Sequence, residues 1–222
     1  MTTVTFVLFP GVTQLDMTGP AQVLSRLPGA RTVVAAHSLD PIPTDSGFSL
    51  IATATFAHAP QADIICVPGG HGVTEALTDP ELIDFVARQS ASARWVTSVC
   101  TGAFILGKAG LLRGKRAATH WAYAHLLPLV GATHCAERVV EDGNVITAGG
   151  VTAGIDFALT LIARDAGQAT AEAVQLALEY DPAPPFAAGN PASAGEAHTA
   201  MLRERVYDAA AARMATALSR TQ

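Results

Sequence analysis

Charge is scarce in this sequence. Of its 222 residues, 14 are Lys or Arg and 19 are Asp or Glu, which gives a net charge of −5 and a charged fraction of 15%, against about 25% in an average soluble protein. Hydrophobic residue types make up 50% of the chain. A chain so poor in charge and rich in apolar residues is not intrinsically disordered. The mildly acidic balance, with no Lys/Arg cluster, argues against binding of nucleic acid.

Long apolar runs and cysteine motifs are also missing. No apolar run reaches the ~18 residues needed to cross a bilayer, because Lys108 interrupts the best candidate, Gly102–Leu112. The first residues lack the basic start of a signal peptide. Cys66, Cys100 and Cys135 are widely spaced and form neither a CxxC pair nor a zinc-binding pattern. These absences predict a cytoplasmic protein with free thiols, no bound metal and no membrane contact.

The chain alternates short β-rich runs with helical patterns. We expect strands at Val4–Phe9, Arg31–His37, Phe48–Phe56, Asp63–Val67, Trp95–Val99, Ala117–Thr119, Arg138–Val140 and Val145–Ala148. We expect helices at Leu15–Leu24, after Thr78-Asp79-Pro80, from Thr101, at His120–Leu127, Thr152–Arg164 and Thr170–Tyr180, and from about Glu196. This alternation predicts an α/β three-layer sandwich, in which a mostly parallel sheet has helices on both faces. A single domain, 1–222, would include a proline-rich loop at 181–191.

The sharpest candidate for a reactive side chain is Cys100. The strand Trp95–Val99 delivers it directly to a helix beginning at Thr101, and such a switch at one residue forces a strained turn that exposes the side chain. The free N–H groups and positive dipole of the helix face the sulfur, which predicts a depressed thiol pKa. Many cysteines are only small buried hydrophobes, and that interpretation fits Cys66 and Cys135 better.

Two more loops leave the carboxyl ends of predicted strands, where ligands of such sheets bind. Asp16 is the first ionisable side chain of the chain. Its apolar neighbours, and a nearby thiolate, would raise its pKa and suit it to proton transfer. The alternative is a carboxylate that caps a helix. Gly69 and Gly70 would let backbone N–H groups approach a substrate, although such a pair also occurs in simple turns.

The histidines leave alternatives open. His120 precedes Trp121 at a strand-to-helix junction, so it either approaches the sulfur or caps the helix. His71 follows the glycine pair and is either a base or a solvent-exposed loop residue.

Several stretches together resemble the ThiJ/PfpI superfamily of flavodoxin-like α/β proteins, which carry a cysteine on a nucleophile elbow, and within it the members that hydrate isocyanides. The superfamily's proposed proteases have a His directly after the cysteine, whereas this chain has Thr101 there. Many members have Glu where this chain has Asp16, and the isocyanide-hydrating members have Asp. The matching stretches are Leu15–Pro20, Val67–Gly70, Thr97–Gly102, Ala118–Trp121, Gly149–Asp156 and Leu178–Phe186.

The resemblance implies hydration of an isocyanide to an N-substituted formamide, without metal or organic cofactor. Cys100 would attack the isocyanide carbon to form a covalent thioimidate, with Asp16 as general acid and base. Thr101 would hydrogen-bond Asp16, and N–H groups near Gly69, Gly70 and Thr101 would polarise the site. Residues expected in the surrounding shell are His120, Trp121, Val151 and Thr152.

The resemblance also implies a homodimer, which agrees with the low charge. Two alternative functions stay open. One is a non-catalytic ligand or cysteine-oxidation sensor, since a reactive thiol oxidises readily with or without catalysis. The other is a glyoxalase or deglycase activity on α-oxoaldehydes.

Overall fold

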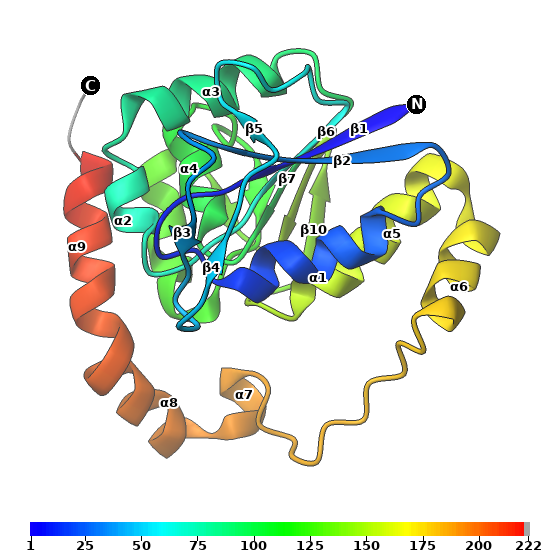
Figure 1. The fold of residues 1–222 in the computed structure, drawn as a ribbon. Helices are drawn as coiled ribbons and strands as arrows, with labels where there is room; N and C mark the ends of the chain where they lie inside the picture. The colour runs from blue at the N-terminus through cyan, green and yellow to red at the C-terminus, as the bar shows by residue number, and fades with distance from the viewer. Residues whose placement is uncertain (220–222) are drawn as a thin grey trace.

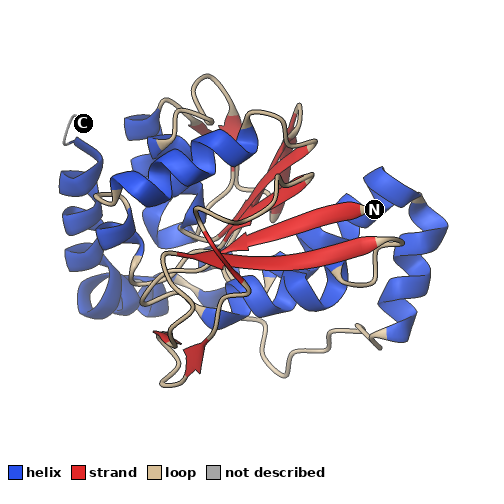
Figure 2. Ribbon diagram, turned by 45° about the horizontal axis from the view of Figure 1, so that its top comes forward, coloured by secondary structure: helices blue, strands red, loops and turns tan. Residues whose placement is uncertain are grey.

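The computed structural model describes residues 1–219, which form a central sheet between two layers of helices (Figures 1 and 2). The sheet has seven strands in the order β10-β11-β7-β6-β1-β2-β5. All neighbours are parallel except the antiparallel hairpin β10–β11, which confirms the predicted three-layer α/β sandwich. The strands are β1 (Thr2–Val7), β2 (Ala30–Ala36), β5 (Ala54–Thr55), β6 (Ile64–Val67), β7 (Trp95–Val99), β10 (Val139–Asp142) and β11 (Val145–Ala148).

Helices cover both faces of the sheet because its central strands are apolar on both sides. Every residue of β6 is buried, as expected of a strand inside a parallel sheet. On one face α1 (Gln14–Leu24) packs against α5 (Ala153–Ala166), and α6 (Gln168–Ala177) packs on α5. The other face carries α2 (Val73–Ala76), α3 (Pro80–Ser90) and α4 (Gly102–Lys108). Among residues 1–219, no helix has the length and apolarity to cross a membrane.

The predicted strand Phe48–Phe56 is wrong as a single element. Its first part, β4 (Ser49–Leu50), pairs with β3 (Ile42–Pro43), and its second part is the edge strand β5. Between them the Thr53 hydroxyl accepts a hydrogen bond from the Val34 N–H at 2.9 Å. This side-chain bond occupies a donor that a continuous strand would pair with backbone, so the ladder is interrupted.

The segment after Ala118 also differs from prediction. The expected strand Ala117–Thr119 contributes only β8 (Arg116–Ala117), which pairs with β9 (Thr133–His134) in a separate small sheet. The expected helix His120–Leu127 is a 3-10 helix, η1 (Trp121–Val130). Pro128 lies within it, and proline lacks the N–H and clashes with the preceding turn of an α-helix.

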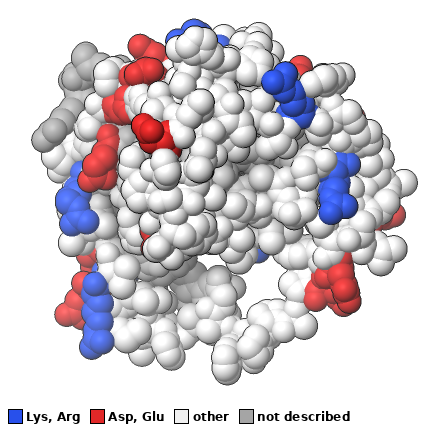
Figure 3. Space-filling model, in the orientation of Figure 1, with Lys and Arg blue, Asp and Glu red and all other residues white. Residues whose placement is uncertain are grey.

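The C-terminal part leaves the body of the protein and returns to it. Helix α6 ends at Ala177 rather than at the predicted Tyr180, and the proline-rich segment that follows is exposed and spans an open gap in Figure 3. The predicted terminal helix begins at Glu196, as expected, but includes a π-helical turn. The elements are α7 (Pro191–Ala194), α8 (Glu196–Leu202), η2 (Arg203–Tyr207) and α9 (Asp208–Ser219).

Helix α9 packs against η1 and α2. It therefore lies beside the carboxyl end of the sheet (Figure 1). In the face of Figure 3, the charged side chains lie around the periphery and the centre is uncharged. The few charged residues of the sequence are therefore also unevenly placed, because the centre of this face has none.

Candidate active site

Cys100 lies at the turn between β7 and α4. Its φ of 56° falls in the left-handed region, which non-glycine residues rarely adopt, and this confirms the predicted strained elbow. The Cys100 N–H donates to the carbonyl oxygens of Ala148 and Gly149, at 3.1 and 2.9 Å. The Thr119 hydroxyl donates to the Cys100 carbonyl at 2.8 Å. Hydrogen bonds to two segments distant in the chain therefore hold the elbow in its strained conformation.

Asp16, in the first turn of α1, lies beside Cys100. The Asp16 side chain is fully buried, and Cys100 is 6% exposed. The two side chains are close enough for each to shift the pKa of the other, and the Gly69 N–H donates to Asp16 Oδ2 at 2.9 Å. Burial raises the pKa of Asp16 to about 7, against the lowering effects of the Gly69 N–H and the Cys100 thiol. The apolar context of Asp16 in the sequence predicted this direction.

The predicted depression of the Cys100 pKa is wrong. Burial, followed by the negative charge of Asp16, raises the pKa of the thiol well above its ordinary value. The backbone N–H groups of Thr101 and Val151 face the sulfur and lower its pKa by less. Loss of hydration outweighs the dipole of α4, which has only seven residues. As the pH rises through about 7, the pair therefore loses one of its two protons and keeps the other.

The loop Gly69–Gly70 hydrogen-bonds Asp16 and Thr101, the neighbours of Cys100. The Gly70 N–H donates to Thr101 Oγ1 at 3.0 Å, and the Thr101 hydroxyl lies 3.4 Å from the Gly70 carbonyl oxygen, to which it donates. These bonds take the place of the expected bond between Thr101 and Asp16. Because the Gly69 amide is also bonded, to Asp16, both glycine amides hold site residues in place instead of facing a substrate.

The two carboxyl oxygens of Asp16 differ in their hydrogen bonding. Within the described part of the chain, buried Oδ1 has no hydrogen-bond partner. An unsatisfied buried oxygen is costly, so Oδ1 loses its hydration without a compensating hydrogen bond. No group of three or more His, Cys, Asp and Glu side chains among residues 1–219 is arranged to hold a metal ion.

His120 serves as a cap. Its Nδ1 accepts a hydrogen bond from the Ala122 N–H at 3.4 Å, at the start of η1. Its ring lies against Gly150, where an added Cβ would be 2.7 Å from His120 Cδ2. Burial lowers the pKa of His120 to about 4, so the ring is neutral at neutral pH. His71 is exposed on its loop.

The loop that carries Val151 is anchored by polar contacts. Val151 has a φ of 29° and offers its N–H to Cys100. Arg138 Nη2 donates to Thr152 Oγ1 at 3.0 Å, and Arg138 also pairs with Asp156. The Tyr180 hydroxyl donates to Asp156 Oδ1 at 2.8 Å. Two of the stretches that resemble the superfamily, Gly149–Asp156 and Leu178–Phe186, are thus joined beside the elbow.

Residues that the sequence did not indicate complete the surroundings. Tyr123 and Tyr207 belong to an aromatic cluster with His120 and Trp121. Burial first, and then the negative charge of Cys100, raise the pKa of both tyrosines. Tyr123 adjoins the stretch Ala118–Trp121, whereas Tyr207 is far along the chain and no motif marks it.

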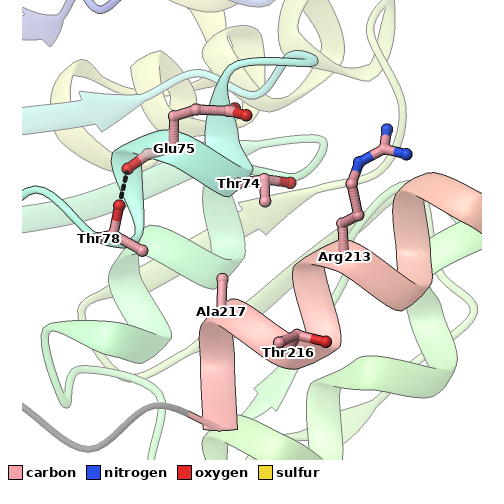
Figure 4. A pocket seen from close by; sticks show the side chains of 6 residues that line it. All are labelled: Thr74, Glu75, Thr78, Arg213, Thr216 and Ala217. Carbon is pink, nitrogen blue, oxygen red and sulfur yellow. Dashed lines mark hydrogen bonds between the residues drawn. The ribbon is translucent and has the colours of Figure 1, made fainter.

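Two cavities flank this region. One, of about 320 Å³, lies between α2 and α9, with Glu75 on one wall and Arg213 on the other (Figure 4). A larger one, of about 860 Å³, lies between η1 and α7 and reaches Thr119, Gly150 and Trp121 beside the elbow. Cys100 and Asp16 are not among the residues that line these two cavities.

Comparisons with known proteins agree with this geometry. A model of the DJ-1/PfpI family matches residues 2–164. The chain is 52% identical over 200 residues to a Pseudomonas putida protein named isonitrile hydratase, covering 90% of this chain and 88% of that protein. A crystal structure of a ThiJ/PfpI family protein from Pseudomonas syringae superposes with a TM-score of 0.95 at 38% identity, covering 99% of this chain and 91% of the other. A DJ-1 superfamily protein from Salmonella typhimurium gives a TM-score of 0.71 at 29% identity, covering 82% of this chain and 100% of that one.

Proposed function

The chain belongs to the DJ-1/PfpI family, and we propose that it is an isocyanide hydratase, which converts an isocyanide and water to an N-substituted formamide. Isonitrile is a synonym of isocyanide, and the relative from Pseudomonas putida is named for this activity. The observation that carries the proposal is the buried pair of Cys100 and Asp16, which supplies a nucleophile and a carboxyl whose pKa lies near neutral pH.

The first half-reaction uses the proton that the pair shares. Transfer of this proton from Cys100 to Asp16 gives a thiolate beside a neutral carboxylic acid. The thiolate attacks the terminal carbon of R–N≡C, and Asp16 donates its proton to that same carbon. The product is a thioimidate, Cys100–S–CH=N–R, and an ionised Asp16. A carboxyl with a pKa near 7 suits this step, because it takes up and releases the proton with little free-energy change.

In the second half-reaction Asp16 acts as a base. It removes a proton from a water molecule, which attacks the thioimidate carbon, and it returns the proton to the nitrogen. The tetrahedral adduct then loses its hydroxyl proton and expels the sulfur, which releases R–NH–CHO and regenerates the one-proton pair. The N–H groups of Thr101 and Val151 stabilise the sulfur when it carries negative charge.

Turnover measurements test the function directly. Purified protein should convert alkyl and aryl isocyanides to the corresponding formamides, and should not convert methylglyoxal at a comparable rate. Turnover of methylglyoxal alone would favour a glyoxalase or deglycase. A protein that turns over neither compound would fit a ligand or oxidation sensor and would contradict the proposal.

Gly69→Ala should damage the site by crowding Asp16 and Thr101. The new Cβ would lie 2.6 Å from both N and Oγ1 of Thr101 and 2.9 Å from Asp16 Oδ2, so these groups must shift from their places beside Cys100. We expect kcat/KM for isocyanide hydration to fall about 100-fold and the free energy of unfolding to fall by about 1–3 kcal/mol. Gly189→Ala is the matched control, because nothing lies within 4 Å of its added Cβ. Equal kcat/KM values for the two variants would contradict the packing role of Gly69.

The proposal includes a cytoplasmic homodimer. Exposed apolar side chains support a subunit contact: Leu176 on α6 is 82% exposed, and Phe186 in the proline-rich segment is 80% exposed. Free cysteines at 66, 100 and 135 agree with a reducing compartment. Sedimentation of the purified chain at micromolar concentration should give the mass of a dimer, and the mass of a monomer would contradict this part of the proposal.

A further inference from the structure

Tyr207 comes from a part of the chain outside the matched family core. The family model ends at residue 164, whereas Tyr207 is the last residue of the π-helical turn η2. Helix α9, which follows it, packs against η1 and brings this end of the chain back to the body of the protein (Figure 1). A segment added to the core thus supplies a side chain to the surroundings of Cys100.

The ring of Tyr207 closes an aromatic cluster. Its centroid lies 5.0 Å from that of His120, 5.3 Å from that of Trp121 and 5.9 Å from that of Tyr123. Arg203, one turn earlier in η2, lies over the Trp121 ring at 5.4 Å. Contacts at these distances are those of aromatic and cation–π pairs, so the π-helical turn is fixed to η1 by its side chains.

The cluster lies close to the reacting sulfur. His120 packs on Gly150, and the preceding residue, Gly149, accepts a hydrogen bond from the Cys100 N–H at 2.9 Å. When Cys100 is ionised, its charge also raises the pKa of the phenols of Tyr123 and Tyr207. Tyr123 is 6% exposed and Tyr207 is half-buried, so Tyr207 is the outermost of the two phenols.

We propose that Tyr207 is a specificity-determining residue, which selects isocyanides with an aromatic substituent. This inference rests on the proposed function. An isocyanide is linear at nitrogen and carbon, so when its carbon meets Cys100, its substituent points away from the sulfur. The faces and edges of Tyr207, Tyr123 and His120 offer such a substituent aromatic contacts, and His120 is neutral. We call these three side chains the aromatic wall. A neutral aryl group fits the aromatic wall, and a charged or strongly polar substituent does not.

The test compares two substrates and three variants. The kcat/KM ratio of phenyl isocyanide over methyl isocyanide should fall about 3- to 10-fold in Tyr207→Ala, mainly through KM for the phenyl compound. Tyr207→Phe keeps the ring and should stay within about twofold of the wild type. Val206→Ala is the control on the same turn, because Val206 is 44% exposed, and it should leave the ratio unchanged. An unchanged ratio in Tyr207→Ala, or an equal loss in Tyr207→Phe, would overturn the proposal.

A second readout separates this inference from the proposed function. Alkylation of Cys100 by iodoacetamide and by its N-phenyl derivative needs no turnover, and peptide mass spectrometry can follow it at this cysteine alone. Tyr207→Ala should lower the phenyl preference of alkylation, whereas Tyr207→Phe should keep it. If the protein hydrates no isocyanide but shows this change, the proposed function fails and the aromatic wall stands. If it hydrates isocyanides and neither ratio changes, the wall fails.

Discussion

Cys100→Ser should lower kcat for isocyanide hydration by at least about 10⁴-fold, as loss of a covalent nucleophile does in other enzymes. A hydroxyl is a much weaker acid than a thiol, so Asp16, with its pKa of about 7, cannot generate the nucleophile from serine. The two side chains are close in size, so the free energy of unfolding should change by less than about 1.5 kcal/mol. Formamide release, measured by mass spectrometry, and chemical denaturation report the two quantities.

Cys135→Ser is the matched control for this variant. Cys135 is a free, partly exposed cysteine. It lines the larger cavity and is not part of the reacting pair. Its replacement should leave kcat within about twofold of the wild type. Residual turnover of Cys100→Ser at a tenth of the wild-type rate would exclude covalent catalysis by Cys100.

Asp16→Asn should abolish activity and stabilise the fold. Loss of a group that donates and removes protons in both half-reactions should lower kcat by about 10³-fold. The carboxyl has an ordinary pKa of 3.8 and a folded-state pKa of about 7, so the folded protein binds this proton more tightly than the unfolded chain. Between about pH 4 and 7 the free energy of unfolding therefore falls as the pH rises, by roughly 4 kcal/mol in total.

Asparagine removes this pH dependence, because it does not ionise. Above pH 7 the variant should thus be more stable than the wild type, and the difference should shrink toward pH 4, where both folded and unfolded wild-type chains are protonated at this position. Urea denaturation at pH 5 and pH 8 measures the effect. Asp84→Asn, which replaces an exposed carboxyl, should change neither activity nor the slope with pH. A variant less stable than the wild type at pH 8 would show that Asp16 is not a strained buried acid.

The same pair sets the pH dependence of wild-type activity. The form with one shared proton appears as the pH rises through about 7. It persists until Cys100, whose pKa lies well above its ordinary value of 9.0, also ionises. We therefore expect kcat/KM to rise through pH 7 and to remain level past pH 9, and a fall between pH 7 and 9 would contradict the shared proton.

The elbow and its acid could be predicted because their signals are local. A buried strand that ends at Cys100 and a helix that follows at once define the turn, and the absence of any ionisable side chain before Asp16 indicates its apolar surroundings. The contacts of Thr101 could not be predicted, since they depend on how the Gly69–Gly70 loop approaches the elbow. The prediction of a low thiol pKa failed for a similar reason, because the burial of Cys100 depends on how the whole site is assembled.

The rest of the site depends on long-range packing. Tyr207 reaches the surroundings of Cys100 only because η2 and α9 fold back onto η1, and no local pattern in the sequence encodes this return. The split of the predicted strand Phe48–Phe56 likewise depends on distant partners, since β4 pairs with β3 and Thr53 bonds to Val34. The periodicity of a short segment indicates its element type, whereas contacts between distant segments decide where it is interrupted.

If Cys100 and Asp16 add water to an isocyanide, the formamide oxygen comes from the solvent, and an isotope label can follow it. Phenyl isocyanide is incubated in H₂¹⁸O with the wild type and with Cys100→Ser, and the N-phenylformamide is analysed by mass spectrometry. We expect formamide with one ¹⁸O atom from the wild type and only the uncatalysed background from the variant. Equal rates of formamide release from the two proteins, or none from the wild type, would contradict it.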